Sequence, residues 1–421
     1  MEEHFERTPE DGGWSTYGPD CEREGEPVVY VISELAGIDE DPAEDIQDYL
    51  EGKHSVYDKD HFGEECEFHS DSHYRESPVN DREWWFQWHR FKNSLQAEAR
   101  FFNREAAEHL EALFKGLGTL KSWKGLPLIT TAGPGTRLRS LYRARVFQSE
   151  KGLSEALSWP ERHLGPPPAA VAGAGRMNPR GISVFYGATA APIAVAEVRP
   201  PVGSQVLVGR FKIVRKLRLL DLTALKFVSE PGSLFDPEFS RRLERAKFLR
   251  SLSEHMTQPV MPDDEAMDYL PTQAIADFLA TGSELELDGI LFPSVQAESR
   301  GKNVVLFHKA ALVRDRELPA GTKIEVKTFQ FTEEGREPDF TVWETIPQSE
   351  PEIDLQHQFS SEMMIDLDLD LDLDLDLQTR QPTLKLDIDS LRVHAIKRVQ
   401  FRTESLPVHR YRIEPESDRK F

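Results

Sequence analysis

Apolar residues recur at spacings of three, four or seven through residues 81–117, which begin DREWWFQWHRFKN. This period matches one face of an α-helix, so we predict a single helix there. Asp81 is the predicted N-cap, and Gly116 and Gly118 are the predicted stop. An aromatic cluster near the start of this helix would anchor it against a larger body. Its members are Trp84, Trp85, Phe86 and Trp88.

The middle of the chain mixes two periods. Short runs rich in β-branched and aromatic residues predict strands at residues 141–146, 183–188, 205–214, 217–222 and 303–307. Helices are predicted at residues 192–198, 235–252 and 273–279. Loops rich in Gly and Pro, such as GPPPAAVAGAG, separate them. The predicted fold class is α+β, with small mixed β-sheets and flanking helices.

The first 80 residues are acidic and full of turn-forming residues, which predicts mostly loop with one short strand at residues 28–32. The opening MEEHFERTPEDGG has no apolar region, so we expect no signal peptide. Apolar stretches elsewhere fall far below the ~20 residues that a membrane-spanning helix needs. The two cysteines form no Cys-x-x-Cys pair, which favours a reducing compartment. We therefore predict a cytoplasmic protein.

The region after residue 318 is polar and low in complexity, and residues 365–377 read IDLDLDLDLDLDL. As a strand, this repeat would stack six aspartates on one face, where like charges repel. Calcium-binding repeats need Gly-rich turns, which are absent here. The sequence favours a solvated tail or an edge strand.

Charge divides the chain further. Residues 136–315 hold 24 basic and 20 acidic side chains, and the total of −22 leaves the flanks with −26. We predict an irregular acidic segment at 1–80, a helical region at 81–125, a mixed domain at 130–318 and an acidic region at 319–421. The acidic total argues against nucleic acid as a partner.

Two candidate sites lie outside the mixed domain. Cys66, His69 and His73 have a spacing that suits tetrahedral zinc, with Cys21 as a distant fourth ligand. The alternative is that they bind no metal, since Cys21 lies far away and no paired Cys motif exists. Arg104 and His109 have the R-x4-H spacing of HEPN ribonucleases, and the alternative is two surface residues on a charged helix.

The densest chemistry lies in residues 141–197. Arg143 and Arg145 fall on one face of a predicted strand, and arginine forks suit a diphosphate. Tyr186 ends an apolar strand, where its ring can stack on a flat heterocycle. Glu197 interrupts the apolar run IAVAEV, so we predict that it is partly buried with a partner or a purpose. The alternative is a plain ion pair with Arg199. The sequence has no Gly-rich phosphate loop.

Six motifs in order, LYRAR, AGRMNPRGISVFYGA, AVAEV, DLT, LDGILFPSV and GKNVVLF, resemble the RES family over about residues 137–313. The family is named for an Arg, a Glu and a Ser, and it includes toxins of bacterial toxin–antitoxin operons. The resemblance implies an ADP-ribosyltransferase-like fold and cleavage of the nicotinamide–ribose bond of NAD. It implies NAD as the substrate, no cofactor, no metal and an antitoxin protein as a partner. Residues 80–130 resemble, more weakly, the HEPN-related extension of larger RES proteins.

The resemblance also assigns roles. The catalytic pair would be Glu197, which stabilises positive charge on the ribose, and Ser294, which positions the ribose or the attacking water or phosphate. NAD would be held by Arg143 and Arg176 at its diphosphate and by Tyr186 at its nicotinamide. Met177 stands where the family usually has Trp.

Three other functions stay open at this point. A mono-ADP-ribosyltransferase that modifies a protein would share the fold and most of the site. A non-catalytic RES scaffold would bind a partner through the Trp-rich helix and the acidic ends, and it predicts a filled or blocked pocket. A ribonuclease would use Arg104 and His109.

Overall fold

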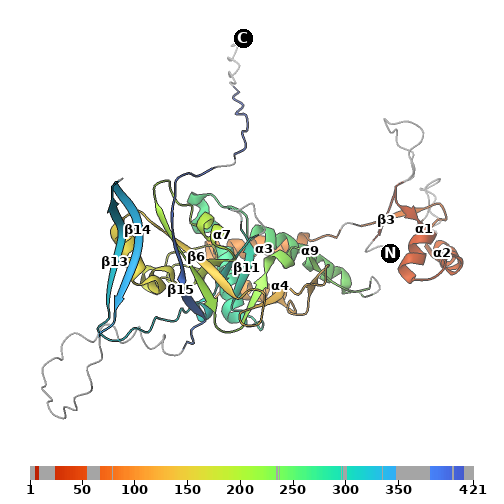
Figure 1. Ribbon diagram of the computed structural model, residues 1–421. Helices are drawn as coiled ribbons and strands as arrows, with labels where there is room; N and C mark the ends of the chain where they lie inside the picture. The colour runs from red at the N-terminus through yellow and green to blue at the C-terminus, as the bar shows by residue number, and fades with distance from the viewer. Residues whose placement is uncertain are drawn as a thin grey trace, which may run out of the picture.

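The computed structural model describes residues 5–8, 24–54, 67–347 and 380–411, except 78, 234, 235, 237, 295, 297–300, 334, 401 and 402. The main body is a mixed eight-stranded sheet in the order β15-β8-β6-β7-β12-β11-β9-β5 (Figure 1). Its strands are β5 Ile129–Ala132, β6 Ser140–Phe147, β7 Phe185–Ala188, β8 Gln205–Ile213, β9 Leu217–Asp221, β11 Gly289–Pro293, β12 Lys302–Leu306 and β15 Leu384–Ala395. The α+β class is confirmed, and the five predicted strands are present, but they all belong to this one large sheet and not to the predicted small sheets.

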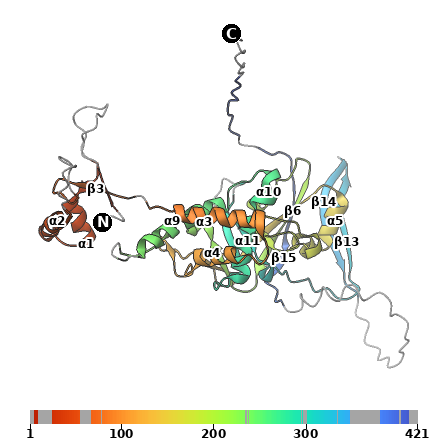
Figure 2. The same ribbon diagram turned by 180° about the vertical axis from the view of Figure 1, so that it is seen from behind.

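Four helices cover one face of this sheet (Figure 2). They are α3 Arg82–Asn93, α4 Arg104–Phe114, α9 Phe239–His255 and α11 Leu270–Asp277. Apolar residues of these helices share a single core with Leu220, Ile290 and Val305 of the sheet. The core is therefore continuous between the Trp-rich helix and the mixed domain.

The prediction of one helix over residues 81–117 is wrong. A loop at residues 99–103 separates α3 from α4, and Phe102 within it has φ of 58°. Asn103 begins the second helix because its side-chain oxygen accepts a hydrogen bond from the Ala106 amide at 3.0 Å. The continuous apolar period conceals this break, since both helices bury their apolar residues in the same core.

Helix α7 (Ala191–Glu197) packs over β6 and β8 on the same sheet face as the four helices, beside Ala188 and Val206. The opposite face is covered by α5 Glu150–Ser158, α6 Pro160–Leu164 and the hairpin of β13 Lys323–Thr332 and β14 Gly335–Thr345. Shorter elements complete the body. They are β4 Lys121–Ser122, β10 Val228–Ser229, α8 Leu222–Leu225 and α10 Glu265–Asp268.

The region after residue 318 contributes to the central sheet, which the polar composition does not predict. Strand β15 pairs antiparallel with β8, and Leu384 and Leu386 are buried in the core of the α5 face. Asp387 on the same strand forms ion pairs with Arg210 and Lys212 of β8. The sheet therefore extends beyond the predicted end at residue 318. The Asp-Leu repeat at residues 365–377 lies outside the described residues.

The first 80 residues contain a small unit with its own core, so the expectation of mostly loop is wrong for its described part. It consists of β1 Phe5–Arg7, β2 Glu26–Pro27, β3 His73–Glu76, α1 Val28–Ala36 and α2 Glu40–His54. The strand predicted at residues 28–32 is the start of α1. Val28, Val31 and Ile32 are buried at a helical spacing, which outweighs their β-branched chemistry.

Among the described helices, none combines the length and the apolar character that crossing a bilayer would require.

His109 of α4 lies in the aromatic core, with its ring 6.3 Å from Trp84 and 5.4 Å from Phe91. It is 8% exposed, and neither ring nitrogen has a hydrogen-bond partner among the described residues. Arg104 is exposed. The alternative of two surface residues is therefore wrong for His109, and the enclosed ring of His109 does not support the ribonuclease interpretation.

We predict that His109 makes the protein less stable in mild acid. Burial lowers the pKa of His109 to about 4, so the unfolded chain binds its proton more readily than the folded protein below about pH 6.5. Stability present at neutral pH is lost as the pH falls from about 6.5 toward 4. Urea unfolding should show a loss of about 2 kcal/mol between pH 7 and pH 5 from this group.

His109→Leu should remove this part of the pH dependence. His89 on α3 is exposed, and His89→Leu should leave the dependence in place. An unchanged pH dependence in His109→Leu would contradict the assignment.

Candidate active site

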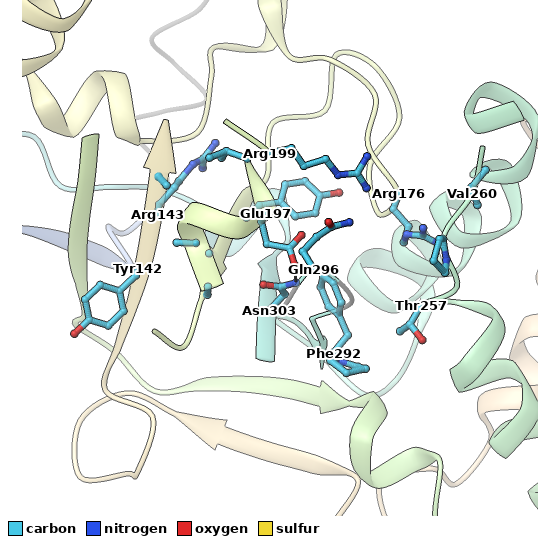
Figure 3. A pocket seen from close by; sticks show the side chains of 18 of the residues that line it. Tyr142, Arg143, Arg176, Glu197, Arg199, Thr257, Val260, Phe292, Gln296 and Asn303 are labelled. Carbon is cyan, nitrogen blue, oxygen red and sulfur yellow. Dashed lines mark hydrogen bonds between the residues drawn. The ribbon is translucent and has the colours of Figure 1, made fainter. Parts of the chain in front are cut away.

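A cavity of about 360 Å³ opens on the helical face of the sheet, beside α7 (Figure 3). Such a volume is typical of small-molecule sites. Of the five site residues predicted from sequence, four line this cavity, and they are Arg143, Arg176, Tyr186 and Glu197. Ser294 does not line it but donates a hydrogen bond to Glu197. The structure therefore brings all five into one neighbourhood.

Arg143 lies where the pairing between strands β6 and β7 is reduced to one residue pair. Strands β6 and β7 are paired only at Tyr142 and Ala188, next to this arginine. Its guanidinium carbon lies 4.9 Å from the centre of the Phe185 ring. The Nη1 atom is shut off from solvent, and no described residue accepts a hydrogen bond from it. Burial lowers the pKa of Arg143 to about 10, so the group stays positively charged at neutral pH.

An uncompensated buried cation is costly. The cavity beside Arg143 therefore favours an anionic ligand, because such a ligand supplies the missing partner. Arg145, two residues on, is exposed and donates instead to the His163 carbonyl at 2.9 Å. Although Arg143 and Arg145 lie on the same face of β6, only Arg143 of the two lines the cavity.

Glu197 ends helix α7 in the middle of the cavity. Its Oε1 atom accepts hydrogen bonds from Ser294 Oγ at 2.6 Å and from Asn303 Nδ2 at 2.7 Å. The described residues donate nothing to its Oε2 atom. The prediction of a partly buried Glu197 is wrong, since the residue is exposed at the cavity. The ion pair with Arg199 is also absent among the described residues, because Ser294 and Asn303 fix the carboxylate.

Tyr186 holds the Gly-rich turn in place. Its hydroxyl accepts a hydrogen bond from the Met177 amide at 3.0 Å and donates one to Asn178 Oδ1 at 2.9 Å. Burial raises its pKa to about 12. A Cβ at Gly175 would lie 2.8 Å from this hydroxyl, so only glycine fits there. Both bonds of the polar tip are thus used within the protein, and only the ring remains for a ligand.

Met177 stands where a Trp is usual, and it does not line the cavity. Its side chain is 2% exposed and belongs to the core beneath the helices. The same turn carries Arg176, whose guanidinium carbon lies 5.0 Å from the centre of the Tyr269 ring. Helix α11 fixes the turn, because Thr272 Oγ1 donates to the Arg176 carbonyl at 2.6 Å and Gln273 donates to the Gly175 carbonyl at 2.8 Å.

Sequence reasoning missed Asn303, Tyr269 and other residues of the cavity wall. Asn303 is 6% exposed on β12, at the start of the run NVVLF, and a polar residue directly before four apolar ones is the signal that could have identified it. Tyr269 has no such signal, because it follows a polar segment far from the other motifs. The remaining wall residues include Phe292, Gln296, Thr257 and Arg199.

The predicted zinc ligands are only partly described. His69 and His73 belong to the N-terminal unit, where His69 Nδ1 accepts from the Asp71 amide. Cys66 and Cys21 lie outside the described residues. Within the described ranges, no three His, Cys, Asp or Glu side chains gather as a metal site would require.

A model of the RES domain family matches residues 140–327. This segment begins with β6, which carries Arg143, and ends within β13. A search of curated proteins and a search of solved structures give no match.

We predict that Tyr186→Phe lowers the free energy of unfolding by about 1–3 kcal/mol, because the Met177 amide and Asn178 lose their partner. Urea denaturation measures this change. Tyr49 on α2 is 70% exposed, so Tyr49→Phe is the matched control and should change little. Equal effects of the two substitutions would show that the hydroxyl does not hold the turn.

Proposed function

We propose, from the premise that residues 140–327 of this chain are a RES domain, that the protein degrades NAD by cleaving its nicotinamide–ribose bond. The family is commonly enzymatic, with toxin-like, NAD-related functions. The observation that carries the proposal is the charge arrangement of the cavity. The guanidinium of Arg143, whose Nη1 has no hydrogen-bond partner among the described residues, and a fixed carboxylate at Glu197 face one space.

The two charges suit different parts of NAD. Its diphosphate is doubly negative, and arginine binds such groups with charge-assisted hydrogen bonds. Figure 3 places Arg143 on one side of Glu197 and Arg176 on the other, so a ligand held by both arginines passes the carboxylate. The ring of Tyr186 offers a flat surface for the nicotinamide.

The bond that breaks joins C1 of the ribose to the pyridine nitrogen. Its electron pair passes to that nitrogen, and nicotinamide leaves as a neutral molecule, so the departing group needs no strong acid. Positive oxocarbenium character develops on the ribose, as in glycoside hydrolysis. Oε2 of Glu197 stabilises this charge and holds a ribose hydroxyl, while Asn303 and Ser294 keep Oε1 in place.

An acceptor then bonds to C1. With water, the products are ADP-ribose, nicotinamide and one proton, and with phosphate they are a phosphorylated ADP-ribose and nicotinamide. A protein acceptor would instead make the enzyme a mono-ADP-ribosyltransferase, related by its fold, and ADP-ribose adducts in mass spectra would reveal it. The scaffold alternative predicts a filled pocket, and the open cavity favours catalysis over it. The antitoxin partner stays a prediction.

We expect Glu197→Gln to release nicotinamide from NAD at least ~100-fold more slowly than the natural chain, because the amide does not stabilise positive charge. The measurement follows nicotinamide by chromatography with the purified full chain. Ser294→Ala should reduce the rate less, since Asn303 still holds Oε1.

Glu111 of α4 is exposed and does not line the cavity, so Glu111→Gln is the matched control and should keep the natural rate. The proposal fails if the natural chain releases no nicotinamide, or if Glu197→Gln releases it equally fast.

A further inference from the structure

Among the described residues, three guanidiniums line the cavity, and none forms an ion pair with a described carboxylate. They belong to Arg143, Arg176 and Arg199. In the proposed function, Arg143 and Arg176 meet the two negative charges of the diphosphate. Arg199 is then a third cation for which the dinucleotide NAD offers no third anion.

Arg199 is held across the cavity. Figure 3 shows its side chain extending from the α7 side toward the side of Arg176. With the Gln296 amide oxygen facing it, Gln296 accepts from Arg199 Nε at 3.3 Å and from Nη2 at 2.8 Å. That partner is neutral, so it orients the guanidinium without cancelling its charge.

Tyr269 lies on the same side of the cavity. Burial and a hydrogen bond to Glu265 raise the pKa of Tyr269, and the positive charges of Arg176 and Arg199 oppose this rise. Arg176 and Arg199 therefore both lie close enough to Tyr269 to affect its pKa. In Figure 3 these two arginines lie on one side of Glu197, and Arg143 lies on the other side.

The backbone gives an independent sign of function. Arg199 follows the end of α7 and has φ of 42°, in the left-handed region that favours glycine. Non-glycine residues held there cost roughly 1–3 kcal/mol and cluster at ligand sites. Glycine would end the helix at lower cost, so a cap alone does not explain an arginine.

We propose that Arg199 binds a phosphate group separate from the diphosphate of the dinucleotide. This inference rests on the proposed function. Two sources share the chemistry. One is a dinucleotide with a third phosphate on its adenosine ribose, as in NADP, where arginine is a known kind of partner. The other is free inorganic phosphate bound beside the dinucleotide.

Calorimetry with the purified full chain separates these sources without depending on catalysis. The ligands are ADP-ribose, ADP-ribose with a 2′-phosphate, and inorganic phosphate added to the ADP-ribose complex. In the natural chain we expect either the 2′-phosphate to raise affinity roughly 10- to 100-fold, or inorganic phosphate to bind the complex. The first result assigns a phosphorylated dinucleotide, and the second assigns free phosphate.

Arg199→Gln should lose that phosphate-dependent gain, whereas Arg180→Gln should keep it, because Arg180 is exposed and does not line the cavity. Arg199→Gly should also lose the gain, with a melting temperature equal to or above that of the natural chain, since glycine relieves the backbone. A purely structural role for Arg199 predicts a lower melting temperature instead.

ADP-ribose binding with no effect of either phosphate, or a gain that survives Arg199→Gln, would overturn the inference alone. If none of the ligands binds, both this inference and the proposed function fail.

Discussion

A guanidinium enclosed by protein keeps its charge but loses its water, and it needs an anion to offset that loss. Arg143 is in this position, with Nη1 unpartnered among the described residues. The surrounding structure leaves this guanidinium facing the cavity of the candidate site. The sheet opens between β6 and β7, and α7 and the turn at residues 175–178 form the walls without supplying a carboxylate for Arg143. In the free protein, the desolvation of the Arg143 guanidinium is thus uncompensated, and an anionic ligand compensates it.

The second half of the site depends on long-range contacts. Asn303 on β12 reaches Glu197 at the end of α7, a separation of 106 residues in sequence. Helix α11 holds the turn that carries Arg176, and Tyr186 holds it from the sheet. The helical layer beneath this turn includes α3 and α4, which lie outside the matched residues 140–327. Helices α3 and α4 therefore support the site by packing beneath this turn, although their described residues do not line the cavity.

The strands and the grouping of the candidate site residues were predictable, because alternating apolar runs and ordered motifs are local signals. Arg143 and Glu197 interrupt such runs, and Tyr186 lies in the last part of one. Asn303 precedes an apolar run, but its role depends on strand pairing that no local pattern reveals. The break at residues 99–103 was concealed because both helices share one core. Strand β15 was hidden by its charged outer face, which ion pairs with β8 compensate. The burial of Glu197 was misjudged, since a helix end can project a carboxylate into a cavity.

Binding of NAD in the absence of cleavage tests the central claim most directly. Glu197→Gln keeps NAD intact long enough for an equilibrium titration, and Arg143→Met in the same background removes the buried charge. The account predicts that the double variant binds NAD at least ~30-fold more weakly, as the loss of a charge-assisted contact implies. It also predicts that, without NAD, the double variant is at least as stable as Glu197→Gln alone, because an unpaired cation has been replaced by an apolar side chain. Equal NAD affinity in the two proteins would contradict the account.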